Sequence, residues 1–159
     1  MSQNTLPTPA WFLAKTDPET YSIQDLKKER RTVWDGVRNP QALRAIRDMR
    51  TGDRVFIYHS MGDAAVVGLA EVVADGRPDP SNPKLAVADF AFLCLLEPPV
   101  TLREIKESGE FGDWALVRQG RLSTMAAPAE FVEWMRQKRP GFERAGKAGD
   151  AATRRDARR

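Results

Sequence analysis

The chain has 159 residues, of which 42% are apolar and 30% are charged, a balance typical of one soluble globular domain. Its single cysteine, Cys94, and its single histidine, His59, exclude a disulfide framework and a closed zinc site, because that site needs several thiolates or imidazoles. The longest apolar run, 90–96, is far shorter than the roughly 20 residues that cross a bilayer, and 1–9 has no signal-peptide pattern. We therefore expect a cytoplasmic protein without a metal, a cofactor or a membrane segment.

The net charge of +3 is concentrated at one end of the chain. Residues 140–159 hold six basic and three acidic side chains, so 1–139 is neutral, with 19 of each sign. We predict a flexible N-terminus over 1–9, one domain over 10–139 and a basic flexible tail over 140–159. Two basic stretches flank an acidic middle in the domain, which fits either a polyanion-binding face or a solvated mixture of charges.

Periodicity and capping signals predict an alternation of strands and short helices. Apolar residues alternate in the expected strands, recur at helical spacing in the expected helices, and Ser22 with Asp25 has the spacing of a capping box. The expected strands are 11–15, 54–59, 66–73 and 85–97, and the expected helices are 22–29, 40–49, 101–108 and 128–138. The proline-rich segment 78–83 is predicted to be irregular, and Pro98-Pro99 to end the last strand.

This order lacks the regular strand–helix repeat of a parallel doubly wound sheet, and the chain has no internal repeats or heptads. We predict a small α+β barrel. The sequence contains no Gly-rich phosphate loop, no nucleophile elbow and no C-x-x-C pair. His59-Ser60 is the only place where a histidine could activate a hydroxyl, and neighbouring strand residues point to opposite faces.

The richest segment for recognition is Trp34-Asp35-Gly36-Val37-Arg38-Asn39. An indole, an arginine and an amide within six residues favour a binding loop over a mere connection, because an exposed indole is costly and an amide needs partners. The alternative is that Trp34 packs into the core, that 35–36 is an ordinary turn, and that Asn39 caps the next helix.

Five blocks of the sequence stand in the order and spacing of the EVE domain, which the chain resembles over about 10–139. The blocks are 10–18 (AWFLAKTDP), 34–39 (WDGVRN), 52–60 (GDRVFIYHS), 67–73 (VGLAEVV) and 116–123 (LVRQGRLS). The resemblance implies a PUA-like mixed β pseudobarrel surrounded by short helices. It also implies a non-catalytic pocket that holds a modified base flipped out of a nucleic acid.

The resemblance places the pocket residues on four of those blocks. They are Lys15, Thr16, Trp34, Val37, Arg38, Asn39, Tyr58, His59, Ser60, Arg121, Leu122 and Ser123. Chemistry fits this role, since an indole can stack on a base and an amide can pair with its Watson–Crick edge. Apolar side chains can contact a base methyl group, and Arg38 or Arg121 can bind phosphate.

The predicted function is recognition of a modified cytosine or adenine in DNA or RNA. The alternative is a small enzyme on modified nucleic acid or a nucleotide, with His59 as the acid or base. Several residues also have a structural interpretation. Tyr58 is more simply barrel filling, His59 a group that hydrogen-bonds a backbone carbonyl, and Ser123 a strand-end hydroxyl.

Overall fold

The computed structural model describes residues 8–143. Its strands are β1 (Trp11–Thr16), β2 (Arg31–Trp34), β3 (Arg54–His59), β4 (Ala65–Asp79), β5 (Asn82–Thr101) and β6 (Thr124–Ala126). Its helices are α1 (Ile23–Glu29), α2 (Pro40–Asp48), α3 (Leu102–Glu107), α4 (Ala115–Arg118) and α5 (Ala129–Lys138). Each of the eight predicted elements is present, and β2, α4 and β6 are additional.

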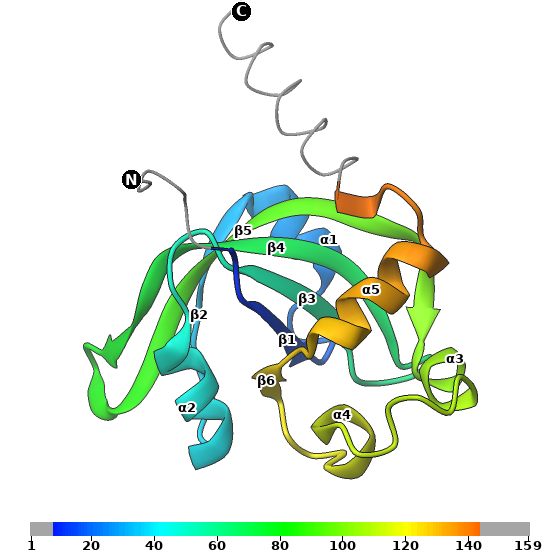
Figure 1. The fold of residues 1–159 in the computed structure, drawn as a ribbon. Coiled ribbons are helices and arrows are strands. Elements are labelled where there is room, and N and C mark those ends of the chain that lie inside the picture. Colours follow the sequence, from blue (N-terminus) through cyan, green and yellow to red (C-terminus); the bar gives the residue numbers. More distant parts are fainter. Residues whose placement is uncertain (1–7, 144–159) are drawn as a thin grey trace, which may run out of the picture.

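The six strands form one mixed sheet in the order β2-β5-β4-β3-β1-β6. Only β1 and β3 pair in parallel among the described strands, and the long β4 and β5 form an antiparallel hairpin. Figure 1 shows the sheet strongly curved, with the short helices around it. The predicted α+β fold, a mixed β pseudobarrel with short helices, is confirmed.

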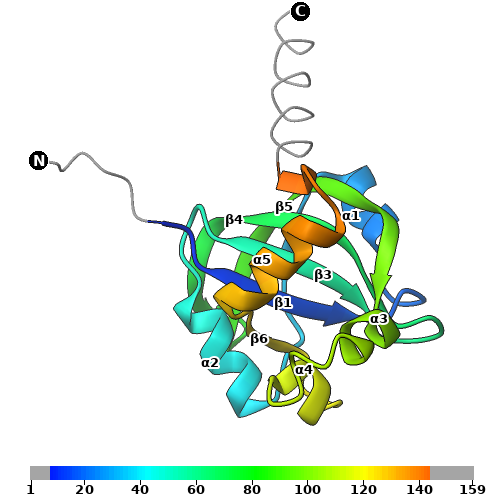
Figure 2. The same cartoon turned by 45° about the vertical axis from the view of Figure 1, so that its right-hand side comes forward.

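Helices α1 and α5 cover opposite faces of the sheet (Figures 1 and 2). Phe56 of β3 packs edge-on against Phe131 of α5, with ring centroids 5.3 Å apart. The neighbouring Ile57 points the other way and pairs with Gly68 of β4, where an added Cβ would lie 2.6 Å from Ile23 of α1. The glycine therefore lets α1 approach the sheet closely.

Side-chain caps fix where three helices begin. Ser22 and Asp25 form the predicted capping box at α1, and Thr101 and Glu104 form another at α3. The Asn39 side chain accepts from the backbone N–H of the first turn of α2, where Pro40 stands at the first helical position. Local sequence thus sets these boundaries, as predicted.

The predictions at the prolines were wrong, because both proline segments lie within or beside long strands. Pro78 lies in β4 beyond the last residue that β3 pairs, so no neighbouring strand on that side needs its missing N–H. Pro98 and Pro99 lie where Val67 of β4 faces the longer segment 96–99 of β5, a bulge that breaks the ladder. The bulge tolerates prolines that a regular ladder would exclude.

The packed chain continues past the predicted boundary at 139. Phe142 is buried, and its ring lies 6.2 Å from that of Trp11 and 5.9 Å from that of Phe56. The flexible termini predicted for 1–9 and 140–159 fall largely outside the described residues.

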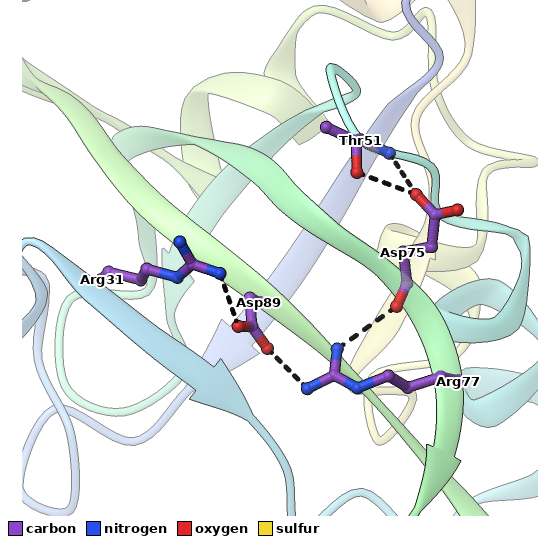
Figure 3. A network of polar contacts seen from close by, with 5 residues as sticks. All are labelled: Arg31, Thr51, Asp75, Arg77 and Asp89. Carbon is purple, nitrogen blue, oxygen red and sulfur yellow. Dashed lines mark hydrogen bonds and ion pairs between the residues drawn. The ribbon is translucent and has the colours of Figure 1, made fainter.

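A polar network ties β2 to the centre of the sheet (Figure 3). The buried Asp89 carboxylate of β5 accepts from Arg31 of β2 at 3.0 Å and from Arg77 of β4 at 2.8 Å. Burial alone would raise the pKa of Asp89, but the bonds and charges of Arg77 and Arg31 outweigh it and leave the pKa below its ordinary value. One charge-assisted contact, from Arg31, therefore fixes the start of β2 to Asp89, and the contact from Arg77 ties the same carboxylate to β4.

Asp53 joins the beginning of the domain to the turn before β3. One buried carboxylate oxygen accepts from the Ala10 N–H at 3.0 Å, and the other accepts from the Arg50 N–H at 2.9 Å. We expect Asp53→Ala to lower the free energy of unfolding by about 2–3 kcal/mol, because it leaves both donors without this acceptor. Urea denaturation checks this, with Asp113→Ala, a fully exposed carboxylate, as the control. Equal midpoints for the two variants would contradict the role given to Asp53.

Candidate functional site

A cavity of about 520 Å³ opens where β1 and β2 end. Its walls come from the end of β1, the turn after it, β2 with the following loop, and the segment before β6. The lining residues are Lys15, Thr16, Asp17, Thr20, Tyr21, Thr32, Val33, Trp34, Asp35, Gly36, Val37, Arg38 and Ser123. Because three strands separate β1 from β2 in the sheet, only a curled sheet brings their ends to one cavity. Its volume lies within the roughly 300–1,000 Å³ of typical small-molecule sites.

Lys15 and Thr16 bring polar groups to the cavity from the end of β1. The Lys15 ammonium donates to the Gly120 carbonyl at 2.9 Å and lies 5.5 Å from the centre of the Tyr58 ring. Burial lowers the pKa of Lys15 from its ordinary value of 10.5, yet two of its three N–H donors are not used by Gly120. The Thr16 hydroxyl donates to the Tyr21 carbonyl at 2.7 Å.

Trp34 lines the cavity but is mostly buried, with 7% of its surface exposed. One face of the indole stacks on Phe90 at 4.9 Å, and Tyr21 meets the indole nearly at a right angle, at 6.0 Å. The two interpretations of Trp34 thus combine, since the ring is part of the core and its remaining surface belongs to the cavity. The indole therefore presents only a small part of its surface to the cavity.

The loop after β2 places Val37 and Arg38 at the cavity and Asn39 away from it. Gly36 adopts a φ of +78°, which favours glycine and turns Val37 and Arg38 toward the cavity wall. Asn39 does not line the cavity. Its side-chain oxygen accepts from the backbone N–H of Gln41 at 2.8 Å and of Ala42 at 3.1 Å, so Asn39 caps α2. The capping interpretation is the one that the structure shows.

Tyr58, His59 and Ser60 lie at the end of β3 and do not line the cavity. Tyr58 is buried, as expected for barrel filling. His59 Nε2 accepts from the Ile23 N–H at 3.0 Å, which makes the ring a cap of α1. The sequence predicted a hydrogen bond from His59 to a backbone carbonyl, whereas the partner in the structure is a backbone N–H and His59 is the acceptor. Ser60 donates its N–H to the Thr16 carbonyl at 3.0 Å.

The segment before β6 contributes one predicted residue to the cavity. Ser123 lines it, and the Ser123 carbonyl accepts from the Lys15 N–H at 2.7 Å. Leu122 is buried and faces a second hollow of about 290 Å³, beside α2 and α4. Arg121 is exposed and lines neither cavity.

Outside the loop 34–39, sequence reasoning missed five lining residues, which are Asp17, Thr20, Tyr21, Thr32 and Val33. The Asp17 carbonyl accepts from the N–H groups of Thr20 and Tyr21, both at 2.9 Å, and this turn folds Tyr21 back beside Thr16. The turn signal at Asp17-Pro18 was available, but it does not say which later side chain the turn returns to the strand.

The contact of His59 with α1 predicts a pH dependence of stability. Burial lowers the pKa of His59 below its ordinary value of 6.5, so the unfolded chain takes up a proton first as the pH falls. The stabilisation is complete above pH 6.5 and is lost as the pH falls toward the lower pKa of the folded state. As the pH falls below 6.5, we expect the urea midpoint of the wild type to decrease more steeply than that of His59→Gln. Parallel pH profiles would contradict this.

The described residues, 8–143, contain neither a candidate membrane helix nor a candidate metal cluster. No helix in this range is long and apolar enough to cross a membrane. Within the same range, His, Cys, Asp and Glu side chains nowhere gather in threes as a metal site would need.

The chain is similar to known proteins over most of its length. The EVE domain model matches residues 10–138. Human thymocyte nuclear protein 1 is 30% identical over 168 aligned positions, which cover 81% of this chain and 75% of the human protein. A solved Pseudomonas syringae protein gives a TM-score of 0.76 at 28% identity, over 82% of this chain and 99% of the other. Human THYN1 protein, in complex with DNA containing 5-methylcytosine, gives 0.76 at 25% identity, over 82% and 98%. The chain therefore belongs to the EVE domain family.

Proposed function

We propose that this chain is a non-catalytic module that binds DNA or RNA by taking one modified cytosine or adenine base, turned out of its strand, into the cavity. The observation that carries the proposal is the cavity itself, which combines aromatic, methyl-bearing, cationic and carboxylate groups at the ends of β1 and β2. The complex of human THYN1 with DNA containing 5-methylcytosine, a structure of the same fold, supports it.

The polar groups of the cavity suit the edge of an amino-bearing base. A carboxylate such as Asp35 can accept from an exocyclic amine, as acidic side chains do at cytosine N4. The unused donors of Lys15 can serve the ring acceptors of the same base. Val37, at the cavity wall, offers apolar contact for a methyl group. Turning out a base costs a few kcal/mol, and stacking on a side chain returns about 1–3 kcal/mol.

Arg38 lies where the cavity meets solvent, so we assign phosphate contact to it, with Arg121 as a second candidate. Since residues 1–139 carry no net charge, few phosphates are neutralised. We expect log affinity to fall against log salt with a slope of about two to three, far below the value near ten of proteins with many phosphate contacts. Fluorescence anisotropy over a salt series measures the slope. A slope near ten would contradict the proposed mode of binding.

The function is tested by the preference for a modified base. Anisotropy compares labelled oligonucleotides, DNA and RNA, that differ only in one 5-methylcytosine. We expect the wild type to bind one methylated probe about 3- to 10-fold more tightly, as burial of a methyl group implies. Lys15→Met should weaken binding to that probe, whereas Lys106→Met, on the exposed side of α3, should not. Equal affinity for methylated and plain probes would remove 5-methylcytosine as the ligand, and equal affinity for probes with methylated adenine as well would remove the proposal.

A catalytic role for His59 gains no support from this geometry. Its Nε2 is already the acceptor for the Ile23 N–H, and the ring does not line the cavity. A general acid or base must reach the proton that it transfers. Turnover of a modified nucleotide that His59→Ala abolishes would restore the enzyme alternative.

A further inference from the structure

Tyr21 is held at its backbone from both sides. Its N–H donates to the Asp17 carbonyl at 2.9 Å, and its carbonyl accepts from the Thr16 hydroxyl at 2.7 Å. Both partners also line the cavity. The main chain of Tyr21 is therefore fixed to the end of β1, directly before α1 begins.

The far end of the Tyr21 side chain is fixed as well. The phenol donates to a carboxylate oxygen of Glu29 at 2.6 Å, a short charge-assisted bond, and the Thr32 hydroxyl is a second partner of the phenol. Partial burial and the Glu29 carboxylate raise the pKa of Tyr21 to about 12, so the phenol stays a neutral donor. Glu29 is the last residue of α1, and Thr32 lies on β2. The Tyr21 side chain therefore links the turn after β1 to both α1 and β2.

Tyr21 is better placed than Trp34 to offer an aromatic face. Trp34 is 7% exposed, and Phe90 covers one side of it, whereas Tyr21 is only partly buried and lines the same cavity. The two rings meet at 80°, so a base lying flat on one of them presents its edge to the other. A ring held at backbone and tip loses little freedom when a base stacks on it.

We propose that Tyr21 supplies the stacking face for the bound base and that Glu29 is the positioning residue that holds the Tyr21 ring at the cavity wall. The inference rests on the proposed function and assigns to Tyr21 the role that the sequence favoured for Trp34. Trp34 then forms the end wall against which the edge of the base abuts.

Variants at the two residues test the proposal in the full chain, with the 5-methylcytosine oligonucleotide that the wild type prefers as the probe. Tyr21→Ala and Tyr21→Leu should each lower affinity about 10- to 100-fold, as loss of base–aromatic stacking implies. Leucine keeps apolar volume beside Trp34, which guards against a mere folding defect. Thermal unfolding verifies that each variant is folded.

The Glu29 series separates positioning from general stability. Glu29→Ala should lower affinity about threefold or more, and Glu29→Gln, which keeps an acceptor for the phenol, should restore most of it. In a Tyr21→Leu background, Glu29→Ala should have no further effect, because the two residues act as one unit. Glu107→Ala, at the corresponding last position of α3, is the matched control.

If the wild type prefers the methylated probe and Tyr21→Leu binds within twofold of it, the assignment of Tyr21 is wrong while the proposed function stands. If Glu29→Ala weakens binding equally with and without Tyr21, Glu29 does not act through the ring. If the wild type prefers no modified probe, the proposed function itself fails, and the stacking role fails with it.

Discussion

Replacing Trp34 with alanine is expected to lower the free energy of unfolding by about 3–5 kcal/mol, the usual range for truncating a buried aromatic ring. The indole is nearly inaccessible, stacks on Phe90 at 4.9 Å and meets Tyr21 edge-on, so its removal leaves a void beneath the cavity. Base preference should be lost in the same variant, because the indole forms one wall of the cavity and also packs against the Tyr21 ring. Urea denaturation and anisotropy measure the two effects.

Trp34→Phe and Val33→Ala make this test interpretable. Phenylalanine keeps a ring on Phe90, so Trp34→Phe should lose less than half of the stability that Trp34→Ala loses, and it should keep part of the base preference. Val33 is the neighbour of Trp34 on β2 and is 46% exposed, so Val33→Ala should change stability little. If Trp34→Ala unfolds no more easily than Val33→Ala, the Trp34 side chain is not part of the core.

The second large effect is expected at Gly76, where β4 crosses α2. A Cβ built at this glycine would lie 1.8 Å from the Ile46 carbonyl oxygen, and the Gly76 N–H donates to the Met49 carbonyl at 3.0 Å. Gly76→Ala must therefore push the backbone of β4 away from the end of α2. We expect a loss of about 3 kcal/mol or more, at the upper end for overpacking, because backbone cannot move aside as a side chain can.

Gly112→Ala is the matched control, since an added Cβ there meets no atom within 4 Å. In the absence of a clash, alanine is at least as favourable as glycine, because it lowers the entropy of the unfolded chain. Urea denaturation of both variants should separate them clearly. Equal stability of Gly76→Ala and the wild type would show that β4 and α2 lie farther apart than the structure places them.

The elements that could be predicted from sequence are those that local chemistry specifies. The capping residues Ser22, Asn39 and Thr101 mark helix starts that the structure reproduces. Strand β2 escaped prediction because it has only four residues and follows a charged helix end; its pairing with β5 joins Arg31 to Ala91, far along the chain. Its place is set by tertiary pairing and by Asp89, which no local pattern reveals.

The residues that line the cavity could likewise be predicted only in part. Lys15, Thr16, Trp34, Val37, Arg38 and Ser123 line the cavity, and the resemblance to the EVE domain had placed all six there. The other six predicted residues do not line it, among them three that serve the backbone or the core instead. Asn39 caps α2, His59 accepts from α1, and Tyr58 is buried in the barrel. Residue type alone could not separate those structural duties from ligand contact.

The most direct measurement of whether the cavity receives a base uses DNA with a ¹³C-labelled methyl group on a single 5-methylcytosine, bound to the full chain. Nuclear Overhauser contacts of that methyl should appear to side-chain protons of Tyr21, Trp34 or Val37, and its contacts to neighbouring bases should disappear. A complex in which the methyl keeps its stacked DNA neighbours and contacts none of these side chains would show that the base never enters.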